Sequence, residues 1–355
     1  MSFTVQVFSA FTAVPANLRE STSFEPSSCS LFYSWQWFEN LFNNALVHEN
    51  EEPRIYFVLD SNQQPVVALF CLAQPSSRTL RSMTNFYSLA YGVVVLQSHC
   101  AQQAISSLVE YITQEQPRWQ KVELLLTQDH DPETTGFVTA LKAKQFSVNA
   151  FFQYENWFLK LNGEDFTSYY QSLSSKLRNT IKRKEKKLAK EHSYDIKLIK
   201  EGEALEQGIA GFVTVYNQSW KKPEPYPDFM PSFIRLCADL GILRLGVLTI
   251  GQQPVAAQLW ITFQSTSTIY KLAYDGNYKV YSVGSILSHF MFKHSIDEDK
   301  VTLIDYGIGS EAYKRDWMRS VQNVQGVEAF NLRTVKGLGL ASKQKVISLL
   351  KTAKS

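Results

Sequence analysis

Cysteine and histidine are scarce in this 355-residue chain, and neither is spaced as a redox or metal motif requires. The four cysteines lie far apart, among apolar or small residues, and form no C-x-x-C pair: Cys29, Cys71, Cys100 and Cys237. We expect them to be buried free thiols in a reducing compartment. The six histidines form no H-E-x-x-H pair, and His289 and His294 are five residues apart, which is the wrong spacing for one helical face. The sequence therefore predicts no metal site.

Long apolar runs are also missing. No apolar stretch approaches the roughly 18 residues that a membrane-spanning helix needs. The N-terminal segment MSFTVQVFSAFTAVPANLRE has no basic region ahead of an apolar run, so it does not resemble a signal peptide. We therefore expect a cytoplasmic protein without a transmembrane segment.

The chain has little excess charge, with a net charge of +3, and so lacks the global basic field of many nucleic-acid-binding proteins. One segment is an exception, because SSKLRNTIKRKEKKLAKEH, residues 174–192, contains eight Lys and Arg. Four apolar residues within or next to it are spaced by four, four and seven: Leu173, Leu177, Ile181 and Leu188. This spacing predicts a helix that docks through an apolar stripe while its lysines face outward.

The 45% hydrophobic content is ample for a packed core, and the length favours two domains. Two segments resemble each other: IYFVLDSNQQPVVALFCL, residues 55–72, and RLGVLTIGQQPVAAQLWI, residues 244–261. Each has two apolar runs around a short polar break, and they share the tetrapeptide QQPV, at Gln63–Val66 and Gln252–Val255. This pattern predicts two β-hairpins.

The elements expected after each hairpin follow the same order: strand, helix, strand. After the first hairpin they are 87–96, about 99–115 and 122–128. After the second they are 268–275, about 283–296 and 301–307. The matched order indicates a duplicated α/β domain, with the basic helix between the copies.

Two motif-bearing segments resemble a known family: IYKLAYDGNYKVYSVGSILSHFMFKHSI, residues 269–296, and LIDYGIGSEAYKRDWM, residues 303–318. They resemble the Fem-like branch of the GNAT acyltransferases and, more closely, the CelD-like or BioF-like acetyltransferases. The matching motif residues are Tyr270, Lys271, Tyr274, Asp275, Tyr281, Gly284, Asp305, Glu311, Tyr313, Lys314 and Arg315. The K-L-R-N sequence at Lys176–Asn179 and the early SLFYSWQWFENLFNN also fit the family. The likeness covers roughly residues 30–335, and its specific part is 268–318.

The resemblance implies an α/β fold of tandem GNAT-like domains with mixed, mainly antiparallel twisted sheets. We expect a structural N-terminal domain at 1–160, a catalytic domain at 161–340 and a tail at 341–355. It also implies an N-acyltransferase whose acyl-CoA lies between strands four and five, 268–275 and 301–307. In such a fold the pyrophosphate lies on backbone amides at the next helix N-terminus.

The expected cofactor-binding residues are Lys271, Tyr281, Ser282, Val283, Gly284 and Ser285. Glycine lets the backbone approach phosphate closely, and Ser282 suits an N-cap, although an ordinary capped helix would show the same features. The common phosphate loop of the family, Gln/Arg-x-x-Gly-x-Gly/Ala, agrees with Tyr281-x-x-Gly284-x-Ile286 at one position only. The first copy has Val93–Leu96 before its helix and no glycine at the helix start, so we expect it to be structural.

The candidate catalytic residues are Asp305, Tyr313, Lys314 and Tyr274. Asp305 lies in an otherwise apolar strand, where it could bond neighbouring amides or, with a pKa raised by desolvation, act as a base. Tyr313 could donate a proton, and Lys314 could bind an anionic substrate or stabilise an oxyanion. In a regular strand Lys271 and Tyr274 point to opposite faces, so only one can face the cleft unless a bulge intervenes.

Several functions follow from these residues. We expect acyl transfer to an amine of an anionic cell-envelope or polysaccharide precursor, with the acceptor bound by Lys176, Arg178, Lys182, Arg183 and Lys186. Fem-like relatives use aminoacyl-tRNA as donor, so tRNA is an alternative partner. The basic helix could instead serve a non-catalytic nucleic-acid-binding protein, although its face lacks interleaved aromatic residues. Two further possibilities are attraction to anionic lipid and a solvated face without a ligand.

Overall fold

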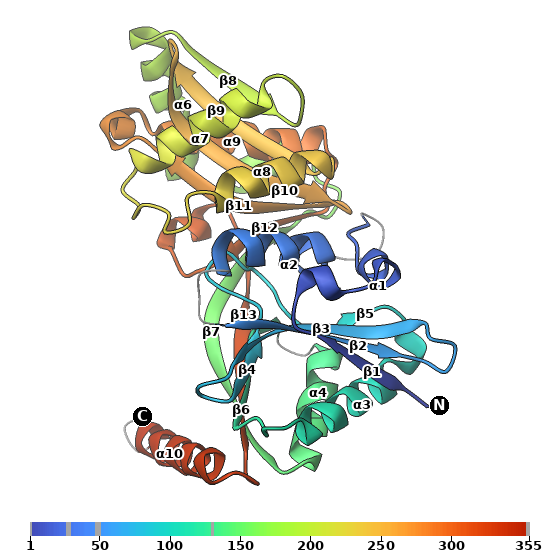
Figure 1. Ribbon diagram of the computed structural model, residues 1–355. Helices are drawn as coiled ribbons and strands as arrows, with labels where there is room; N and C mark the ends of the chain where they lie inside the picture. The colour runs from blue at the N-terminus through green and yellow to red at the C-terminus, as the bar shows by residue number, and fades with distance from the viewer. Residues whose placement is uncertain (1, 26–29, 47–50, 129–130, 353–355) are drawn as a thin grey trace. The chain divides into compact units, whose positions relative to one another are not determined.

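The computed structural model describes residues 2–25, 30–46, 51–128 and 131–352, and it divides the chain into two compact units (Figure 1). Unit 1 comprises Met1–Tyr154 and Asn323–Ser355, and unit 2 comprises Glu155–Gln322. Two strands cross the boundary: β7 (Phe146–Lys160) begins in unit 1 and ends in unit 2, and β13 (Ser320–Asn331) runs the other way.

The sheet of unit 1 has the order β1-β2-β3-β4-β6-β13-β7, with β5 also beside β3. Its pairs are antiparallel where β1, β2, β3 and β4 meet, whereas β4 and β6 are parallel. Its other strands are β1 (Thr4–Phe8), β2 (Glu52–Leu59), β3 (Pro65–Gln74), β4 (Thr79–Ser82), β5 (Val94–Val95) and β6 (Lys121–Gln128). Its helices are η1 (Phe11–Ala13), α1 (Ala16–Ser21), η2 (Leu31–Tyr33), α2 (Trp35–Leu41), η3 (Phe42–Leu46), η4 (Ser98–Cys100), α3 (Ala101–Gln114), α4 (Pro132–Ala143) and α10 (Val335–Thr352).

The sheet of unit 2 has the order β7-β12-β11-β10-β9-β8, and β11–β12 is again a parallel pair among antiparallel ones. Its other strands are β8 (Tyr194–Ile199), β9 (Leu243–Ile250), β10 (Gln253–Phe263), β11 (Thr266–Tyr274) and β12 (Leu303–Ile308). Its helices are α5 (Phe166–Ser172), α6 (Ser175–Glu191), α7 (Leu205–Asn217), α8 (Phe229–Asp239), η5 (Gly276–Tyr281), α9 (Val283–Asp297) and η6 (Ala312–Asp316). The two units therefore repeat one mixed, mainly antiparallel α/β arrangement, as expected for tandem GNAT-like domains.

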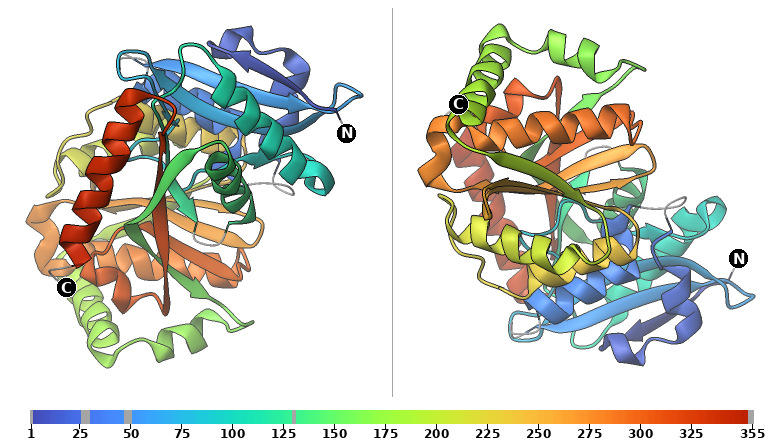
Figure 2. Two further views of the ribbon diagram at one scale, coloured as in Figure 1. Left: turned by 90° about the horizontal axis from the view of Figure 1, so that it is seen from below. Right: turned by 90° about the horizontal axis from the view of Figure 1, so that it is seen from above.

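Helices cover both faces of the unit 2 sheet (Figures 1 and 2). A Cβ added at Gly246 of β9 would meet Met291 and Leu287 of α9. The next residue, Val247, lies beside Gly211 of α7. Because successive strand residues point to opposite faces, α9 and α7 cover opposite sides of the sheet.

Both predicted hairpins are confirmed, as β2–β3 and β9–β10, and each has a register irregularity beside the proline of its QQPV sequence. The docking stripe of the basic helix is also confirmed. Leu173, Ile181 and Leu188 are buried in the core of unit 2, and Leu177 packs against them. Three of the cysteines, Cys71, Cys100 and Cys237, are buried free thiols, whereas Cys29 lies outside the described residues.

The strand predicted at 87–96 is wrong, because only Val94–Val95 is extended there and it pairs with β3. The place beside β6 is taken by β4 instead. The apolar residues of 87–96 are buried through loop contacts, since the Tyr91 hydroxyl donates a 2.6 Å hydrogen bond to the carbonyl of Phe70. Because its residues are buried, this loop has the apolar composition of a strand, and the sequence therefore predicted a strand there.

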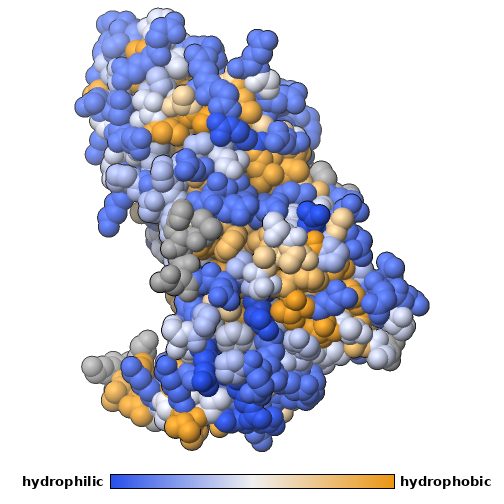
Figure 3. All heavy atoms as spheres, in the orientation of Figure 1, coloured by the Kyte–Doolittle hydropathy of each residue, from blue (hydrophilic) through white to orange (hydrophobic). Residues whose placement is uncertain are grey.

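The domain boundaries also differ from the expected 1–160 and 161–340. Residues from 323 onward belong to unit 1, because Val324–Phe330 of β13 pairs with Lys121–Gln128 of β6. The expected tail at 341–355 lies largely in α10, which has four exposed apolar residues: Val335, Leu338, Val346 and Leu350. Figure 3 shows orange, hydrophobic surface at the lower left, where Figure 1 places α10.

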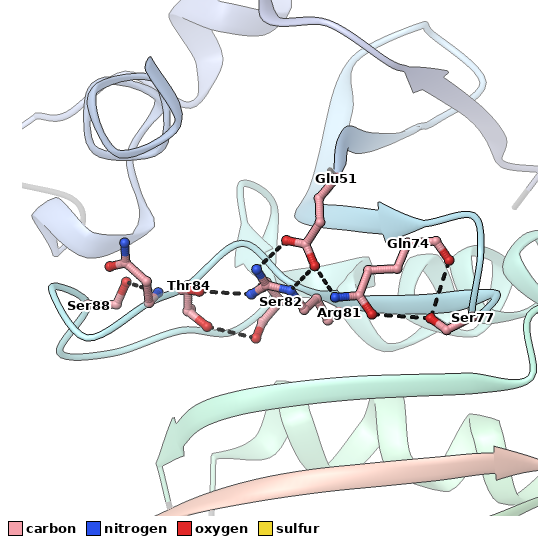
Figure 4. A network of polar contacts seen from close by, with 8 residues as sticks. Glu51, Gln74, Ser77, Arg81, Ser82, Thr84 and Ser88 are labelled. Carbon is pink, nitrogen blue, oxygen red and sulfur yellow. Dashed lines mark hydrogen bonds and ion pairs between the residues drawn. The ribbon is translucent and has the colours of Figure 1, made fainter. Parts of the chain in front are cut away.

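A polar network joins the segment before β2 to β3 and β4 in unit 1 (Figure 4). The Arg81 side chain forms an ion pair with Glu51, and these side chains are 14% and 6% exposed. Arg81 also donates to the carbonyl of Thr84 at 2.9 Å. A buried carboxylate is strongly destabilising when it loses its cation.

We expect Arg81→Ala to lower the free energy of unfolding by about 3 kcal/mol, because Glu51 would stay buried without its guanidinium. Arg78→Ala is the matched control, since Arg78 is exposed, and should cost less than about 0.5 kcal/mol. Urea unfolding followed by circular dichroism measures both. Equal costs for the two variants would show that the ion pair contributes nothing.

Candidate active site

Strands β11 and β12 pair over a short stretch and then separate. Their parallel register covers Thr266–Thr268 against Leu303–Asp305. Beyond Asp305, β12 has a register shift on its other side, where Ile308 pairs with Asn156 of β7. Gly307 and Gly309 in this bulge have φ angles of 66° and 120°, which glycine adopts readily. A gap therefore opens between the carboxyl ends of β11 and β12.

A cavity of about 580 Å³ occupies this region of unit 2. Its walls come from the end of β11, from β12, from the first turns of α9 and from the segments around η5 and η6. The lining residues are Trp220, Leu272, Tyr274, Gly276, Lys279, Gly284, Ser285, Ser288, Tyr306, Tyr313 and Trp317. Of the residues expected at the site, Tyr274, Gly284, Ser285 and Tyr313 are therefore brought together.

The N-terminus of α9 borders the cavity without a side-chain cap. Ser282 occupies the N-cap position, as expected, but it has a left-handed backbone (φ 53°, ψ 43°) and its hydroxyl caps no amide. Helices leave their first amides without intrahelical partners. The amides of Val283 and Gly284 therefore belong to an uncapped helix N-terminus, which is a suitable site for an anion.

Glycine is required at position 284 because the Tyr274 ring lies close to the helix backbone there. A Cβ at this position would lie 3.0 Å from Cδ1 of Tyr274, which also lines the cavity. The first turn of α9 is held by the buried Gln258 of β10, whose Nε2 donates to the carbonyl of Gly284 at 3.1 Å and to Ser288 Oγ at 2.8 Å. The helix N-terminus is thus fixed against the sheet by hydrogen bonds.

Asp305 lies at the last paired position of β12, where the strands separate. Its Oδ1 accepts a 2.7 Å hydrogen bond from the amide of Gly307. Desolvation raises the pKa of Asp305 to about 6, against the lowering effects of the Gly307 amide and the Lys314 ammonium. Asp305 therefore bonds a neighbouring amide, and its raised pKa is compatible with the other interpretation, a general base.

Lys314 is buried beside the β12 bulge. Its Nζ donates to the carbonyls of Ile308 at 2.6 Å and Gly307 at 3.3 Å, and it lies 3.2 Å from Glu311 Oε2. Desolvation lowers the pKa of Lys314. These contacts direct the ammonium to the backbone of the bulge, so its position suits support of Asp305 better than direct contact with a substrate.

Tyr313 is 38% exposed, and its ring meets that of Tyr306 edge-on at 5.8 Å. Desolvation raises the pKa of Tyr313 to about 12. The phenol therefore stays protonated at neutral pH and can donate a proton into the cavity it lines.

Lys271 and Tyr281 do not line the cavity. The bulge in β11 lies at Tyr270, before Lys271, so Lys271 and Tyr274 keep their opposite faces. Lys271 Nζ instead lies 2.7 Å from Glu224 Oε1. Tyr281 turns towards α6, where its hydroxyl donates to Glu191 Oε2 at 2.7 Å. The structure thus gives neither residue the place expected for a cofactor ligand.

The basic residues of α6 divide into two groups. Lys184 Nζ donates to the carbonyl of Val280 at 2.6 Å, Arg178 Nε donates to the carbonyl of Leu173 at 3.1 Å, and Lys187 lies over the Tyr281 ring. The others are exposed and have no ion pair with a carboxylate in the described part of the chain: Lys176, Lys182, Arg183, Lys186 and Lys190.

Seven lining residues escaped the sequence analysis: Trp220, Leu272, Gly276, Lys279, Ser288, Tyr306 and Trp317. Tyr306 and Trp317 lie within the recognised 303–318 segment, so that segment could have indicated them. Trp220 follows α7 in a loop without a recognisable pattern, and it reaches the cavity by packing on Tyr274, with ring centroids 4.5 Å apart.

Two further searches concern metals and membranes. Within residues 2–25, 30–46, 51–128 and 131–352, no group of three or more His, Cys, Asp or Glu side chains is arranged to hold a metal ion. Over the same described ranges, none of the helices combines the length and the apolar character needed to cross a bilayer.

We expect Asp305→Asn to stabilise the protein at neutral pH by about 2 to 3 kcal/mol. The pKa of Asp305 is raised from 3.8 to about 6, so the folded state binds this proton more tightly than the unfolded chain does. Stability from the protonated form is fully present below pH 3.8 and is lost as pH rises through about 6. The gain from Asn should therefore appear at pH 7 to 8 and vanish near pH 4.

Thermal unfolding of both proteins at several pH values measures this difference. The exposed Asp316, changed to Asn, is the control and should show no such pH-dependent gain. A destabilised Asp305→Asn protein at pH 7 would contradict the raised pKa.

A known family model matches the segment that contains this site. Residues 175–315 match the family model of the acetyltransferase (GNAT) domain. No curated protein matches the chain at a significant level.

Similar solved structures extend over nearly the whole chain. A crystal structure of FemX has a TM-score of 0.60 at 9% identity and covers 94% of this chain and 98% of its own. The structure of L-PGS from Bacillus licheniformis has a TM-score of 0.52 at 11% identity, covering 88% and 95%. A putative lysylphosphatidylglycerol synthetase C-terminal domain from Agrobacterium fabrum has a TM-score of 0.50 at 11% identity, covering 85% and 93%.

At these identities the structures show a shared fold, while the domain match places the GNAT segment in unit 2. Together with the separated strands and the uncapped helix beside the cavity, they show a GNAT domain within unit 2 and a fold shared with FemX over most of the chain.

Proposed function

We propose that unit 2 is an N-acyltransferase that moves an acyl group from acyl-CoA to the amine of an anionic cell-envelope or polysaccharide-related acceptor. The observation that carries this proposal is the cavity at the separated ends of β11 and β12, which is bordered by an uncapped helix N-terminus and lies next to a carboxylate with a raised pKa. Acyl transfer to an amine needs both features, a cradle for the donor phosphates and a base for the amine.

The donor phosphates fit the start of α9. The amides of Val283 and Gly284 open the helix, Ser285 lines the cavity beside them, and Lys279 supplies a cation to the same walls. The acyl chain would then extend between β11 and β12 toward Asp305. In unit 1 the corresponding helix, α3, begins at Ala101 without a glycine, which supports a structural role for that unit.

The proposed chemistry uses three side chains. Asp305, ionised above pH 6, takes a proton from the acceptor ammonium. The free amine attacks the acyl carbonyl, so a C–N bond forms and the bond from carbon to the leaving sulfur breaks. Tyr313 protonates the leaving thiolate and regains its proton from the new amide nitrogen, which must lose its second proton. Lys314 acts as a positioning residue that holds the bulge after Asp305.

An aminoacyl-tRNA donor is the second candidate, and the surface of α6 favours it. Lys182, Arg183 and Lys186 are exposed on one helix without ion-paired carboxylates in the described residues, which suits a phosphate backbone. Tyr281, the first position of the common phosphate loop, points to α6 rather than into the cavity. The fold similarity to FemX and to lysylphosphatidylglycerol synthetase is in keeping with this alternative.

The donor assignment is tested by a pair of single methyl additions. Gly284→Ala should weaken acetyl-CoA binding by at least about tenfold, because the methyl displaces Tyr274 from the cavity wall. Gly276→Ala is the matched control, since Gly276 also lines the cavity but its added Cβ meets no atom within 4 Å, and it should stay within about threefold. Isothermal titration with acetyl-CoA, and with aminoacyl-tRNA in parallel, measures both. Unchanged affinity for both donors in Gly284→Ala would place the donor elsewhere.

The role of α6 is tested by reversing its exposed charges. Lys182, Arg183 and Lys186 changed together to Glu should raise the KM of an anionic substrate and flatten its salt dependence, while the docking stripe keeps the helix in place. For a nucleic-acid ligand, the log–log salt slope should fall by roughly 0.7 to 0.9 for each lost phosphate contact. A small anion should give a shallower slope.

The control is an equal reversal on unit 1, at the exposed Lys142, Lys336 and Lys343. It changes the total charge equally but leaves α6 intact. If both triple variants behave alike, the charge of α6 has no specific part in substrate capture.

A further inference from the structure

Two lysines share one aromatic ring beside the proposed active site. Lys221 Nζ and Lys271 Nζ lie 5.5 Å and 5.4 Å from the ring centroid of Tyr216, the penultimate residue of α7. Lys221 Nζ also lies 5.7 Å from the centroid of Trp220. Desolvation and the nearby Glu224 raise the pKa of Tyr216, so the ring stays neutral and attracts both cations.

The carboxylates nearest to Lys221 are paired with other lysines. The charged groups that act on it are two lysines, Lys271 and Lys314, and two glutamates, Glu224 and Glu311. Glu224 is ion-paired with Lys271 at 2.7 Å, and Glu311 with Lys314 at 3.2 Å. Both glutamates are thus paired with other lysines, and no carboxylate of the described residues forms an ion pair with Lys221.

The unpaired ammonium of Lys221 is unfavourable in the isolated protein. Desolvation and the neighbouring Lys271 ammonium lower the pKa of Lys221 to about 8. A half-buried cation without a counter-ion is unfavourable, and such groups concentrate at binding sites. An anion placed beside Lys221 would supply the missing charge.

The lysines also have a fixed relation to the cavity. Each of the three lysines is next in sequence to a residue that lines the cavity. Lys221 follows Trp220, Lys271 precedes Leu272, and Lys314 follows Tyr313. The three lysines and the two glutamates are called the charge cluster below. The lysine of β11 lies on the strand face opposite to the cavity residue next to it. The cluster therefore borders the separated strands from the side of α7, away from the start of α9, where the donor phosphates fit.

We infer that Lys221 binds an anionic group of the acceptor, a carboxylate or a phosphate, whose amine then reaches Asp305 through the gap between β11 and β12. This inference rests on the proposed function and adds to it the side chain that holds the anion of the acceptor. The phosphates of the donor and the anion of the acceptor would then be held on opposite faces of β11. This arrangement keeps the two substrates apart until their reactive ends meet.

The test uses Lys221→Met, which keeps an apolar stem on the two rings and removes the charge. Lys222→Met is the matched control, because Lys222 is the exposed neighbour. The first probes are acetate and inorganic phosphate alone, titrated against the full chain while the lysine side-chain ammonium signals are followed by NMR. Neither probe requires turnover.

In the unmodified protein, an anion that binds should raise the midpoint of the Lys221 titration above about 8. Acetate keeps its charge across this range, so its affinity should fall as pH rises through about 8, where Lys221 loses its proton. Lys221→Met should weaken binding at least about tenfold and Lys222→Met should change it less than about twofold. A response to acetate alone indicates a carboxylate acceptor, and a response to phosphate alone indicates a phosphorylated one. No response to either overturns the inference.

A second arm separates this inference from the proposed function. Acyl transfer is measured to ethylamine, β-alanine and phosphoethanolamine, which share a short amine chain and differ in the anion. The preference for the anionic amines, as a ratio of kcat/KM, should be at least about tenfold and should disappear in Lys221→Met alone. Anion binding without any transfer would support the site and contradict the enzyme, whereas transfer without an anion preference would do the reverse.

Discussion

The active-site geometry depends on one constraint, the early end of the β11–β12 pairing. A parallel pair is held by main-chain hydrogen bonds, and once it ends, the freed backbone groups need other partners. The bulge of β12 after Asp305 satisfies this need in three ways. The Gly307 amide bonds to Asp305, the Gly307 and Ile308 carbonyls accept from Lys314, and the Gly309 amide donates to Glu155 of β7. The gap is therefore stabilised by hydrogen bonds to the freed backbone groups, including those of side chains buried beside it.

The same desolvation that stabilises this backbone arrangement changes its acid–base chemistry. Asp305 and Lys314 have pKa values shifted toward each other, one raised and one lowered, because both lose solvent at the bulge. Each charge still favours the ionised form of the other, so the pair can stay charged at neutral pH while Asp305 remains a better proton acceptor than an exposed aspartate. Stability is given up at this position, as is common at catalytic sites, which is in keeping with the role of base proposed for Asp305.

Local patterns in the sequence indicated most of unit 2 but not the contacts of single side chains. The hairpins, α9 and the docking stripe of α6 follow from periodicity, and the structure has them. The place of Lys271 depended on where β11 bulges, and a bulge at Tyr270 leaves no trace in the order of apolar residues. Tyr281 was misplaced because its hydrogen bond to Glu191 joins residues 90 positions apart.

The domain boundary shows the same limit on a larger scale. A reading along the chain places β13 with the elements that precede it, but its pairing with β6 joins residues from opposite ends of the sequence. Strand alternation says which residues are buried and not which strand lies beside them. Likewise the loop at 87–96 has the burial of a strand without its hydrogen bonds, so composition could not separate the two.

Two kinds of positive charge in unit 2 have different physical roles. The lysines of α6 are solvated, so their attraction acts over roughly a Debye length, weakens with salt and discriminates poorly between anions. Lys221 is half-buried between two rings, so its attraction is short in range and requires the anion to lose water. Long-range capture on an exposed helix and short-range recognition at the strand gap do not compete for the same residues. Under the proposed function, a substrate drawn in by the first would still have to match the second, so specificity would be decided at the gap, next to Asp305.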